Sequence, residues 1–415
     1  MIALLGMLII VATQFLAPKV GVASPLILLA VGLGIGFLPQ VGAIEVEPHL
    51  ILEIILPPLL FSAAVRMPTM DFRREMHAVA MLAIPLVFLS AFAVGFVINW
   101  MDPAISLPWG VALGAVLSPT DAVAVSIAKR SGVSHRIITV LEGEGLFNDA
   151  TSLVLLSAAM NAGLAADNNA LNPGLLIGRV ALALGIAAVI GWIVGEVGVR
   201  VRALLKEPST DTVFSFAMPF LASLPAEHLG GSGLVAAVVA GLVVSRRRAA
   251  LISANNRRFS QQNWETMTLV LESAIFLTMG LQAFGIVEET SEFVGGLTFA
   301  AVLAVTLGTL IMVIRAVFIA LMLTWLDHRR THRKRRFEVE ASRIERFEKR
   351  MNTACEVDAD MLEARNLSPE QWGKALDRWR RRLTRRERRN AMRGSDLDYF
   401  ENEPLGPREA SVIVW

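Results

Sequence analysis

Residues 142–154 read EGEGLFNDATSLV and place three carboxylates and one carboxamide inside an otherwise apolar segment. Apolar residues flank this stretch on both sides, from Ile137 to Ala159. A charged side chain at the centre of a membrane helix costs at least about 2.5–3.5 kcal/mol, so it marks an ion or proton pathway or pairs with another buried charge. The first question is therefore whether the surrounding chain crosses a membrane.

The composition indicates that it does. The chain has 415 residues, of which 54% are hydrophobic and 18% charged, and this excludes an ordinary soluble enzyme. The apolar residues come in runs long enough for helices to cross a hydrocarbon core of about 30 Å. We predict an all-α polytopic membrane protein with eleven spans, at residues 1–17, 20–38, 49–66, 77–99, 106–128, 137–161, 174–198, 209–225, 232–245, 263–284 and 296–325.

The loops between these spans predict the orientation. Lys and Arg concentrate in every second loop, at 66–75, 129–136, 200–208 and 245–258, and are nearly absent from the others. Basic loops face the cytoplasm. We therefore expect a multi-pass protein of the cell membrane with its N-terminus outside and the segment after Leu326 inside.

That segment, residues 327–407, is charge-dense with apolar residues at roughly helical spacing, and Ser368 to Gln371 have the pattern of a helix start. We expect a cytoplasmic helical segment, either a solvated hairpin or a ligand-binding module. Its basic clusters favour anionic lipid headgroups. The interleaved acidic residues argue against nucleic acid.

Within the span 137–161, Gly145, Asp149 and Ser152 share one helix face, and Glu144 and Asn148 share the adjacent one. Arg315 is the one arginine well inside an apolar span.

Two isolated buried charges of opposite sign are far more probable as a pair, so we predict a structural ion pair between Glu144 and Arg315. Asp149 is then expected to take up a cation or a proton, with Ser152 and Glu142 as secondary candidates. The alternative is that Asp149 only hydrogen-bonds a neighbouring helix.

The preceding span contains LSPTDAVAVSIAK, residues 117–129. Pro119 should break this helix, and a break at membrane depth is tolerated where it is buried or lines a cavity. Thr120 and Asp121 lie at the break, where freed carbonyls and helix ends can coordinate Na⁺ or H⁺. The glycines of GLGIG (32–36) and the pair Gly191 and Gly195 are interpreted as helix-packing residues.

The two motifs together, SPTDAVAV (118–125) and EGEGLFNDATSLV, resemble those of the monovalent cation:proton antiporters, in the sodium/proton exchanger branch with an Asn-Asp pair. LPPLLFSAAVRM (56–67) and IRAVFIALMLTWL (314–326) are also similar to that family. The resemblance covers most of residues 1–326. It implies that Asp149 carries the ion next to Asn148, and that Thr120 and Asp121 form the broken-helix site. It also implies that Asp149 and Thr120 are ligands of the transported Na⁺ or K⁺, and that Glu144 pairs with Arg315.

The same resemblance implies a sodium/proton antiporter fold of thirteen spans and a homodimer. Residues 1–326 would form the transmembrane domain, with a core from 77–99, 106–128, 137–161 and 296–325. The dimerisation domain would come from 1–66 and 174–245, and the linker from 263–284. Gly145 and Ser62 replace a serine and an acid that many relatives have, which bears on cation selectivity. Residues 408–415 resemble the start of a further span, so we expect eleven of the thirteen spans here.

We therefore expect a secondary transporter, not an enzyme, that exchanges Na⁺ or K⁺ for H⁺ by alternating access and needs no cofactor. One titrating carboxylate, Asp149, implies one-for-one electroneutral exchange. A cation channel is an alternative, although no glycine-rich filter sequence is visible. A non-transporting scaffold that signals through its basic segment is another, and it would leave the buried Asn148 and Asp149 unexplained.

Overall fold

The computed structural model describes residues 2–37, 47–119, 133–164, 173–292 and 296–355, together with the helical residues 374, 377–381, 383–384 and 387. No strand occurs in this described part, so the predicted all-α class is confirmed. The helices are α1 (Ile2–Val20), α2 (Ser24–Gly36), α3 (Pro48–Leu50), the π-helical turn η1 (Ile51–Ile55), α4 (Leu56–Arg66), α5 (Thr69–Ala83), α6 (Pro85–Met101), α7 (Leu107–Leu117), α9 (His135–Leu164), α10 (Pro173–Leu204), α11 (Pro208–His228), α12 (Gly233–Leu251), α13 (Ala254–Glu292) and α14 (Gly296–Cys355).

The chain divides into two compact units, one over Met1–Phe318 and the other starting at Ile319, within α14. In the second unit, Ile344 and Leu383 form a small apolar cluster with Phe347 and Trp379, whose rings meet edge to face at 6.3 Å. Within the predicted charged segment 327–407, helix is thus seen up to Cys355 and again around Leu383. The predicted helix start at Ser368 lies outside the described residues.

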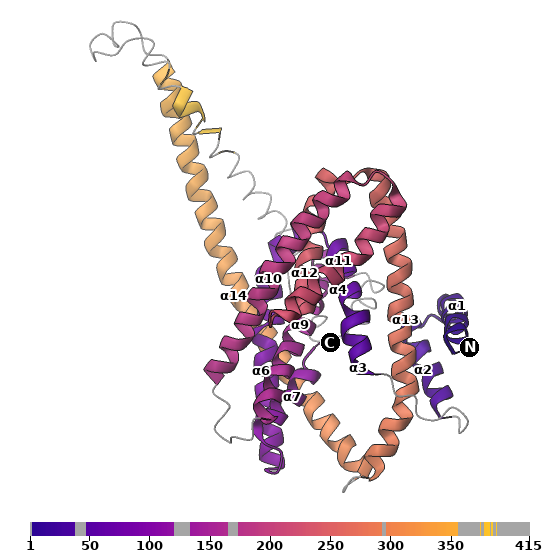
Figure 1. Ribbon diagram of the computed structural model, residues 1–415. Helices are drawn as coiled ribbons and strands as arrows, with labels where there is room; N and C mark the ends of the chain where they lie inside the picture. The colour runs from indigo at the N-terminus through magenta and orange to yellow at the C-terminus, as the bar shows by residue number, and fades with distance from the viewer. Residues whose placement is uncertain are drawn as a thin grey trace, which may run out of the picture. The chain divides into compact units, whose positions relative to one another are not determined.

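In the first unit, α12 packs against α4, α10 and α11 (Figure 1). The contact with α10 is close because small residues face each other across it. A Cβ on Gly191 would collide with the carbonyl oxygen of Ala236, and one on Gly195 would lie 2.9 Å from that of Ala240. Lipid tails solvate apolar side chains as well as protein does, so helices in a membrane associate through such close backbone approach.

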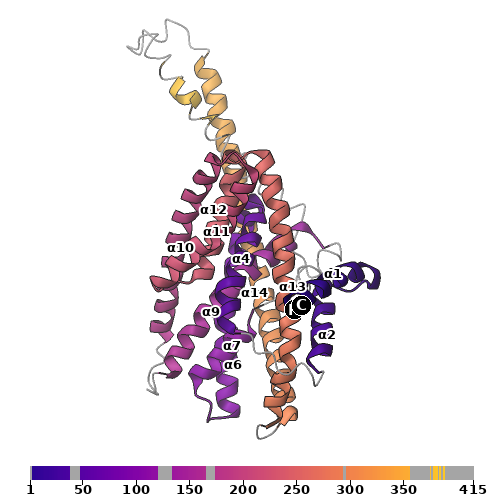
Figure 2. The same ribbon diagram turned by 45° about the vertical axis from the view of Figure 1, so that its right-hand side comes forward.

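A second close contact joins α2 and α13, which lie side by side in Figures 1 and 2. A Cβ on Gly32 would lie 2.6 Å from the carbonyl oxygen of Leu277, and one on Gly36 would lie 2.9 Å from that of Leu281. The packing role predicted for the glycines of both motifs is confirmed at these positions.

A further group of helices lies around α9, which packs against α5 and α7, while α6 packs against α7 (Figure 2). Small apolar residues fill the contact of α6, α7 and α9, among them Ala91, Ala115 and Ala159, none of them exposed. The first part of α14 joins α6 through Leu307, which packs on Val94 and Ile98. The assignment of these groups to a core and a dimerisation domain stays a prediction.

One predicted span is not a single helix. The span 77–99 is interrupted at Ile84, where α5 ends and α6 begins at Pro85. Pro85 has no backbone N–H to continue the hydrogen-bond ladder, and its ring disfavours helical geometry at the preceding residue. The predicted span 77–99 nevertheless lies within the helical stretch Met70–Met101, which is long and apolar enough to cross a membrane.

In the described part, four helical stretches are long and apolar enough to cross a membrane: Met70–Met101, Gly178–Leu204, Ala254–Val287 and Thr298–Trp325. Three shorter apolar helices accompany them: Leu4–Val20, Ser24–Gly36 and Leu107–Leu117. Each predicted span contains helix in the structure. The count of eleven crossings stays a prediction.

The contact of α10 and α12 yields a matched pair of substitutions. Gly191→Ala should lower the free energy of unfolding by about 1–3 kcal/mol, because the new methyl group forces the two helices apart. Gly185→Ala on the same helix should cause no loss, since nothing lies within 4 Å of a Cβ there. Unfolding of both variants in detergent measures the difference, and equal stabilities would show that the two helices do not depend on this approach.

Candidate functional site

The candidate site centres on α9, the helix that carries EGEGLFNDATSLV. Glu144, Asn148 and Ser152 follow one another at intervals of four residues and are 1%, 1% and 3% exposed. Asp149 and Gly145 lie beside this row and are half-buried. The most deeply buried polar row is thus Glu144, Asn148 and Ser152, with Asp149 at its margin.

Glu144 and Arg315 are brought together by α9 and α14. Arg315 Nη1 lies 2.7 Å from Glu144 Oε1, and Arg315 Nη2 donates a hydrogen bond of 2.8 Å to Oε2. Their side chains are 6% and 1% exposed. This fork geometry uses both carboxylate oxygens, which makes it a strong form of charge-assisted hydrogen bond.

Ser152 connects the row to α7, because its hydroxyl donates to the carbonyl oxygen of Ala115. Two residues after Ala115 the helix α7 ends at Leu117, just before Pro119, which has no N–H to extend it. Ser118 is 7% exposed, and its hydroxyl has no hydrogen-bond partner in the described part of the chain. The end of α7 therefore presents a buried hydroxyl near the carbonyl that Ser152 contacts.

The structure describes most of the predicted site residues. Glu142, like Asp149, is half-buried on α9. Thr120 and Asp121 lie outside the described residues, so their placement beside Asp149 stays a prediction.

Oxygen atoms dominate this group: the carboxylate of Asp149, the carboxamide of Asn148, and the hydroxyls of Ser118 and Ser152. Hard cations such as Na⁺ prefer oxygen ligands, and a carboxylate also accepts a proton. No cluster of three or more His, Cys, Asp and Glu side chains that could hold a resident metal occurs among the described residues. The arrangement suits a transiently bound monovalent cation or a proton.

Two further buried ion pairs were not predicted. Arg136 on α9 donates to both carboxylate oxygens of Glu75 on α5, with 7% and 2% of the side chains exposed. Arg202 on α10 bonds Asp211 on α11 at 2.7 and 2.8 Å, with 4% and 0% exposed.

All four residues lie in or next to the loops that were predicted to be basic and to face the cytoplasm. The sequence offers a signal, since Glu75 is an acid among basic residues and Asp211 lies in the first turn of α11. Their partners could not be deduced from it.

Comparison with known proteins places this arrangement in a family. The family described as "Sodium/hydrogen exchanger, transmembrane" matches residues 4–344. An uncharacterized Na⁺/H⁺ exchanger of Escherichia coli (strain K12) is 35% identical over 64% of this chain and 49% of its own length. A sodium, potassium, lithium and rubidium/H⁺ antiporter of Bacillus pumilus (strain SAFR-032) is 31% identical over 68% of this chain and 43% of its own length.

The fold also matches a solved structure. The sodium proton antiporter MjNhaP1 from Methanocaldococcus jannaschii aligns with a TM-score of 0.53 and 22% identity, over 68% of this chain and 71% of that one. This likeness shows the fold alone.

The chain spans about half the length of the curated relatives it matches. The matched region nevertheless contains the row on α9, the end of α7 and Arg315. The chain belongs to the sodium/hydrogen exchanger family of monovalent cation:proton antiporters, which are multi-pass membrane proteins.

Proposed function

We propose that this protein exchanges Na⁺ or K⁺ for H⁺ across the cell membrane, one for one, with the cation and the proton competing for Asp149. Asn148 lies beside Asp149 and contributes a neutral oxygen. Thr120 and Asp121 at the Pro119 break complete the cation site. Alternating access exposes this site to one side of the membrane at a time.

The observation that carries the proposal is the bidentate contact of Glu144 with Arg315. Both oxygens of Glu144 are held by a guanidinium, which keeps a positive charge at all physiological pH values. Glu144 is therefore committed to holding α9 against α14. The carrier role falls to Asp149, which lies one helical turn further along α9 and is half-buried rather than enclosed.

The charge at the site supports electroneutral exchange. Glu144 and Arg315 cancel each other, and Asn148 is neutral. If Asp149 alone changes its occupant, the site carries the same charge with a proton as with Na⁺ or K⁺.

The names of the relatives support an alkali metal ion as the transported cation. The Bacillus pumilus relative is named for four alkali metal ions, and others are named for Na⁺. Side chains with oxygen ligands and one carboxylate suit this class. Gly145 lies at a position where relatives often have serine, and this difference bears on selectivity among these ions.

We also propose an orientation and an oligomeric state. The N-terminus lies outside, the charged segment 327–407 lies in the cytoplasm near anionic headgroups, and the protein is a homodimer. The alternation of basic loops and the family resemblance support these assignments.

Asp149→Asn should reduce exchange to the background of empty vesicles while the protein still reaches the membrane, because the amide cannot exchange a proton for a cation. Cation-dependent dequenching of a pH-sensitive dye in everted vesicles, with the full-length protein, measures this. Glu142→Gln is the matched control on the same helix and should keep most of the activity. Substantial exchange by Asp149→Asn, with loss in Glu142→Gln, would transfer the carrier role to Glu142.

Glu144→Gln should mainly affect stability, because it leaves Arg315 buried without a counter-charge. Breaking a buried pair in this way typically costs about 3–5 kcal/mol. The double variant Glu144→Gln with Arg315→Gln removes both charges and should recover part of the loss. Unfolding in detergent compares the three proteins. A double variant no more stable than the single one would contradict the structural role.

Exchange by the wild-type protein should not respond to membrane potential. Proteoliposomes loaded with a pH dye can be assayed with and without an imposed potassium diffusion potential, using Na⁺ as the transported cation. Equal initial rates are expected because no net charge crosses the membrane. A rate that follows the sign of the potential would refute the one-carboxylate account.

A further inference from the structure

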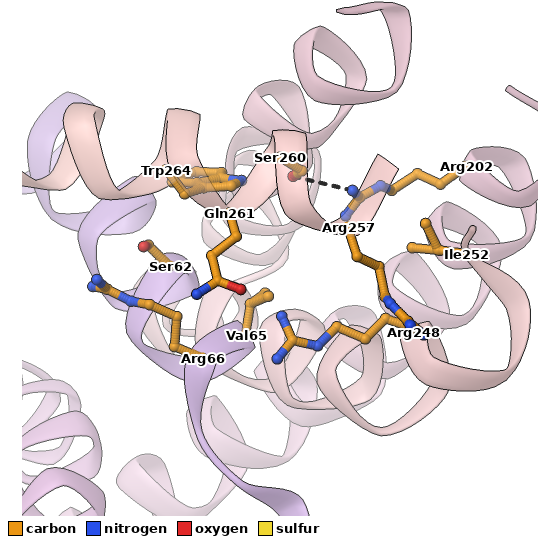
Figure 3. Close-up of a pocket in the computed structure, with 10 residues that line it drawn as sticks. All are labelled: Ser62, Val65, Arg66, Arg202, Arg248, Ile252, Arg257, Ser260, Gln261 and Trp264. Atoms are coloured by element: carbon orange, nitrogen blue, oxygen red, sulfur yellow. Dashed lines mark hydrogen bonds between the residues drawn. The ribbon is translucent and has the colours of Figure 1, made fainter. Parts of the chain in front are cut away.

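A pocket lies away from the proposed ion site, where α4, α10, α12 and α13 come together (Figure 3). Its lining includes four arginines, one from each helix: Arg66, Arg202, Arg248 and Arg257. The other lining residues are Ser62, Val65, Ile252, Ser260, Gln261 and Trp264. No carboxylate is among these lining residues, which come from the part of the chain that the structure describes.

The four arginines are not equivalent. Arg202 is neutralised by its ion pair with Asp211, and it also donates a hydrogen bond of 3.2 Å to Ser260, drawn in Figure 3. Arg66, Arg248 and Arg257 have no ion pair in the part of the chain that the structure describes. Three positive charges therefore share one pocket without a matching negative charge.

Ordinary surface arginines are fully solvated, but two of these three are only partly so. Arg248 and Arg257 are half-buried, whereas Arg66 is exposed. Burial lowers the pKa of Arg248, and the nearby charges of Arg257 and Arg202 lower it further. The pocket thus concentrates like charges in a partly desolvated place, where a bound anion would relieve their repulsion.

The contacts around the pocket hold its donors in place. Arg257 Nη1 donates a 2.9 Å hydrogen bond to the carbonyl oxygen of Ala249, near the end of α12. Ser260 accepts from Arg202, so its own hydroxyl proton is directed elsewhere. Gln261 is anchored by a 3.0 Å hydrogen bond from its amide to Glu265.

The last turns of α4 and α12 attract positive charge through their helix dipoles, and this accounts for Arg66 and Arg248 one at a time. Arg257 has a structural role of its own, because it caps the carbonyl of Ala249 near the end of α12. These separate roles do not explain why the three charges line one pocket.

We propose that this pocket binds the phosphate group of a dianionic phosphate compound, held by Arg66, Arg248 and Arg257 with help from Ser260. The planar fork of a guanidinium matches a phosphate through paired hydrogen bonds. The cavity is small, about 20 Å³, so only part of the anionic head enters it and the rest of the molecule stays outside. The head could belong to free phosphate or to a phosphomonoester lipid.

An anion bound here would link α4, α12 and the start of α13 through one ligand. Anything that binds the folded protein and not the unfolded chain raises its stability in proportion to occupancy. Binding is thus measurable without transport, and it does not depend on the proposed exchange.

The test uses the purified full-length protein in a neutral detergent and follows its melting temperature. One arm titrates inorganic phosphate against sodium chloride of equal ionic strength. The other titrates dioctanoyl phosphatidic acid against dioctanoyl phosphatidylcholine. A rise with phosphate above that in matched sodium chloride identifies a soluble ion as ligand, a rise with phosphatidic acid alone identifies a lipid headgroup, and either supports the site.

The variants distinguish binding in the pocket from attraction by general surface charge. Arg248→Gln with Arg257→Gln should weaken binding by about tenfold or more. Arg246→Gln with Arg258→Gln removes the same charge from exposed neighbours that do not line the pocket, and should change affinity by no more than about twofold.

If the first double variant does not fold, Arg248→Lys with Arg257→Lys can replace it. Lysine keeps the charge but lacks the paired donors of a guanidinium, so this variant should bind phosphate less tightly than wild type. The proposal is overturned if neither probe raises the wild-type melting temperature above its matched control. It is equally overturned if both double glutamine variants lose binding alike.

Discussion

The contact between Glu144 and Arg315 is the interaction on which the arrangement of α9 depends. It joins two helices far apart in the sequence, and it places both charges where water cannot solvate them. A buried pair of this kind need not add net stability, but loss of either partner leaves an uncompensated charge. The position of α9 against α14 is therefore restricted to geometries that keep the fork closed. That restriction in turn decides where Asn148, Asp149 and Ser152 lie relative to α7.

Other helix contacts also use buried ion pairs. Arg136 with Glu75 joins α9 to α5, and Arg202 with Asp211 joins α10 to α11. Elsewhere, α12 meets α10 and α13 meets α2 through small residues, where backbone approaches backbone. The helices of this unit are thus held together both by buried ion pairs and by small residues that allow close approach. In a membrane this division is expected, because apolar side chains gain little by leaving lipid for protein.

Much of this could be predicted from the sequence. Arg315 was recognisable because a lone arginine in an apolar run has few possible partners, and Gly32 and Gly191 because small residues recur at helical spacing. The pairs of Arg136 and Arg202 could not be deduced, since a basic residue in a loop is ordinarily solvated and only the tertiary fold encloses it. The break at Ile84 was missed although Pro85 marks it, because hydropathy alone was followed there. The pocket lined by Arg66, Arg248 and Arg257 could not be predicted, because it forms only where the tertiary fold brings four helices together.

The separation of the Glu144–Arg315 pair also has a consequence for biosynthesis. The partners are 171 residues apart, whereas Arg202 and Asp211 are 9 apart. At roughly 5–20 residues per second, α9 emerges from the ribosome roughly ten to thirty seconds before its arginine is made. During that interval, Glu144 must be accommodated by the insertion machinery or by neighbouring helices. The ion pair between α9 and α14 can thus form only after a long further stretch of the chain has been made.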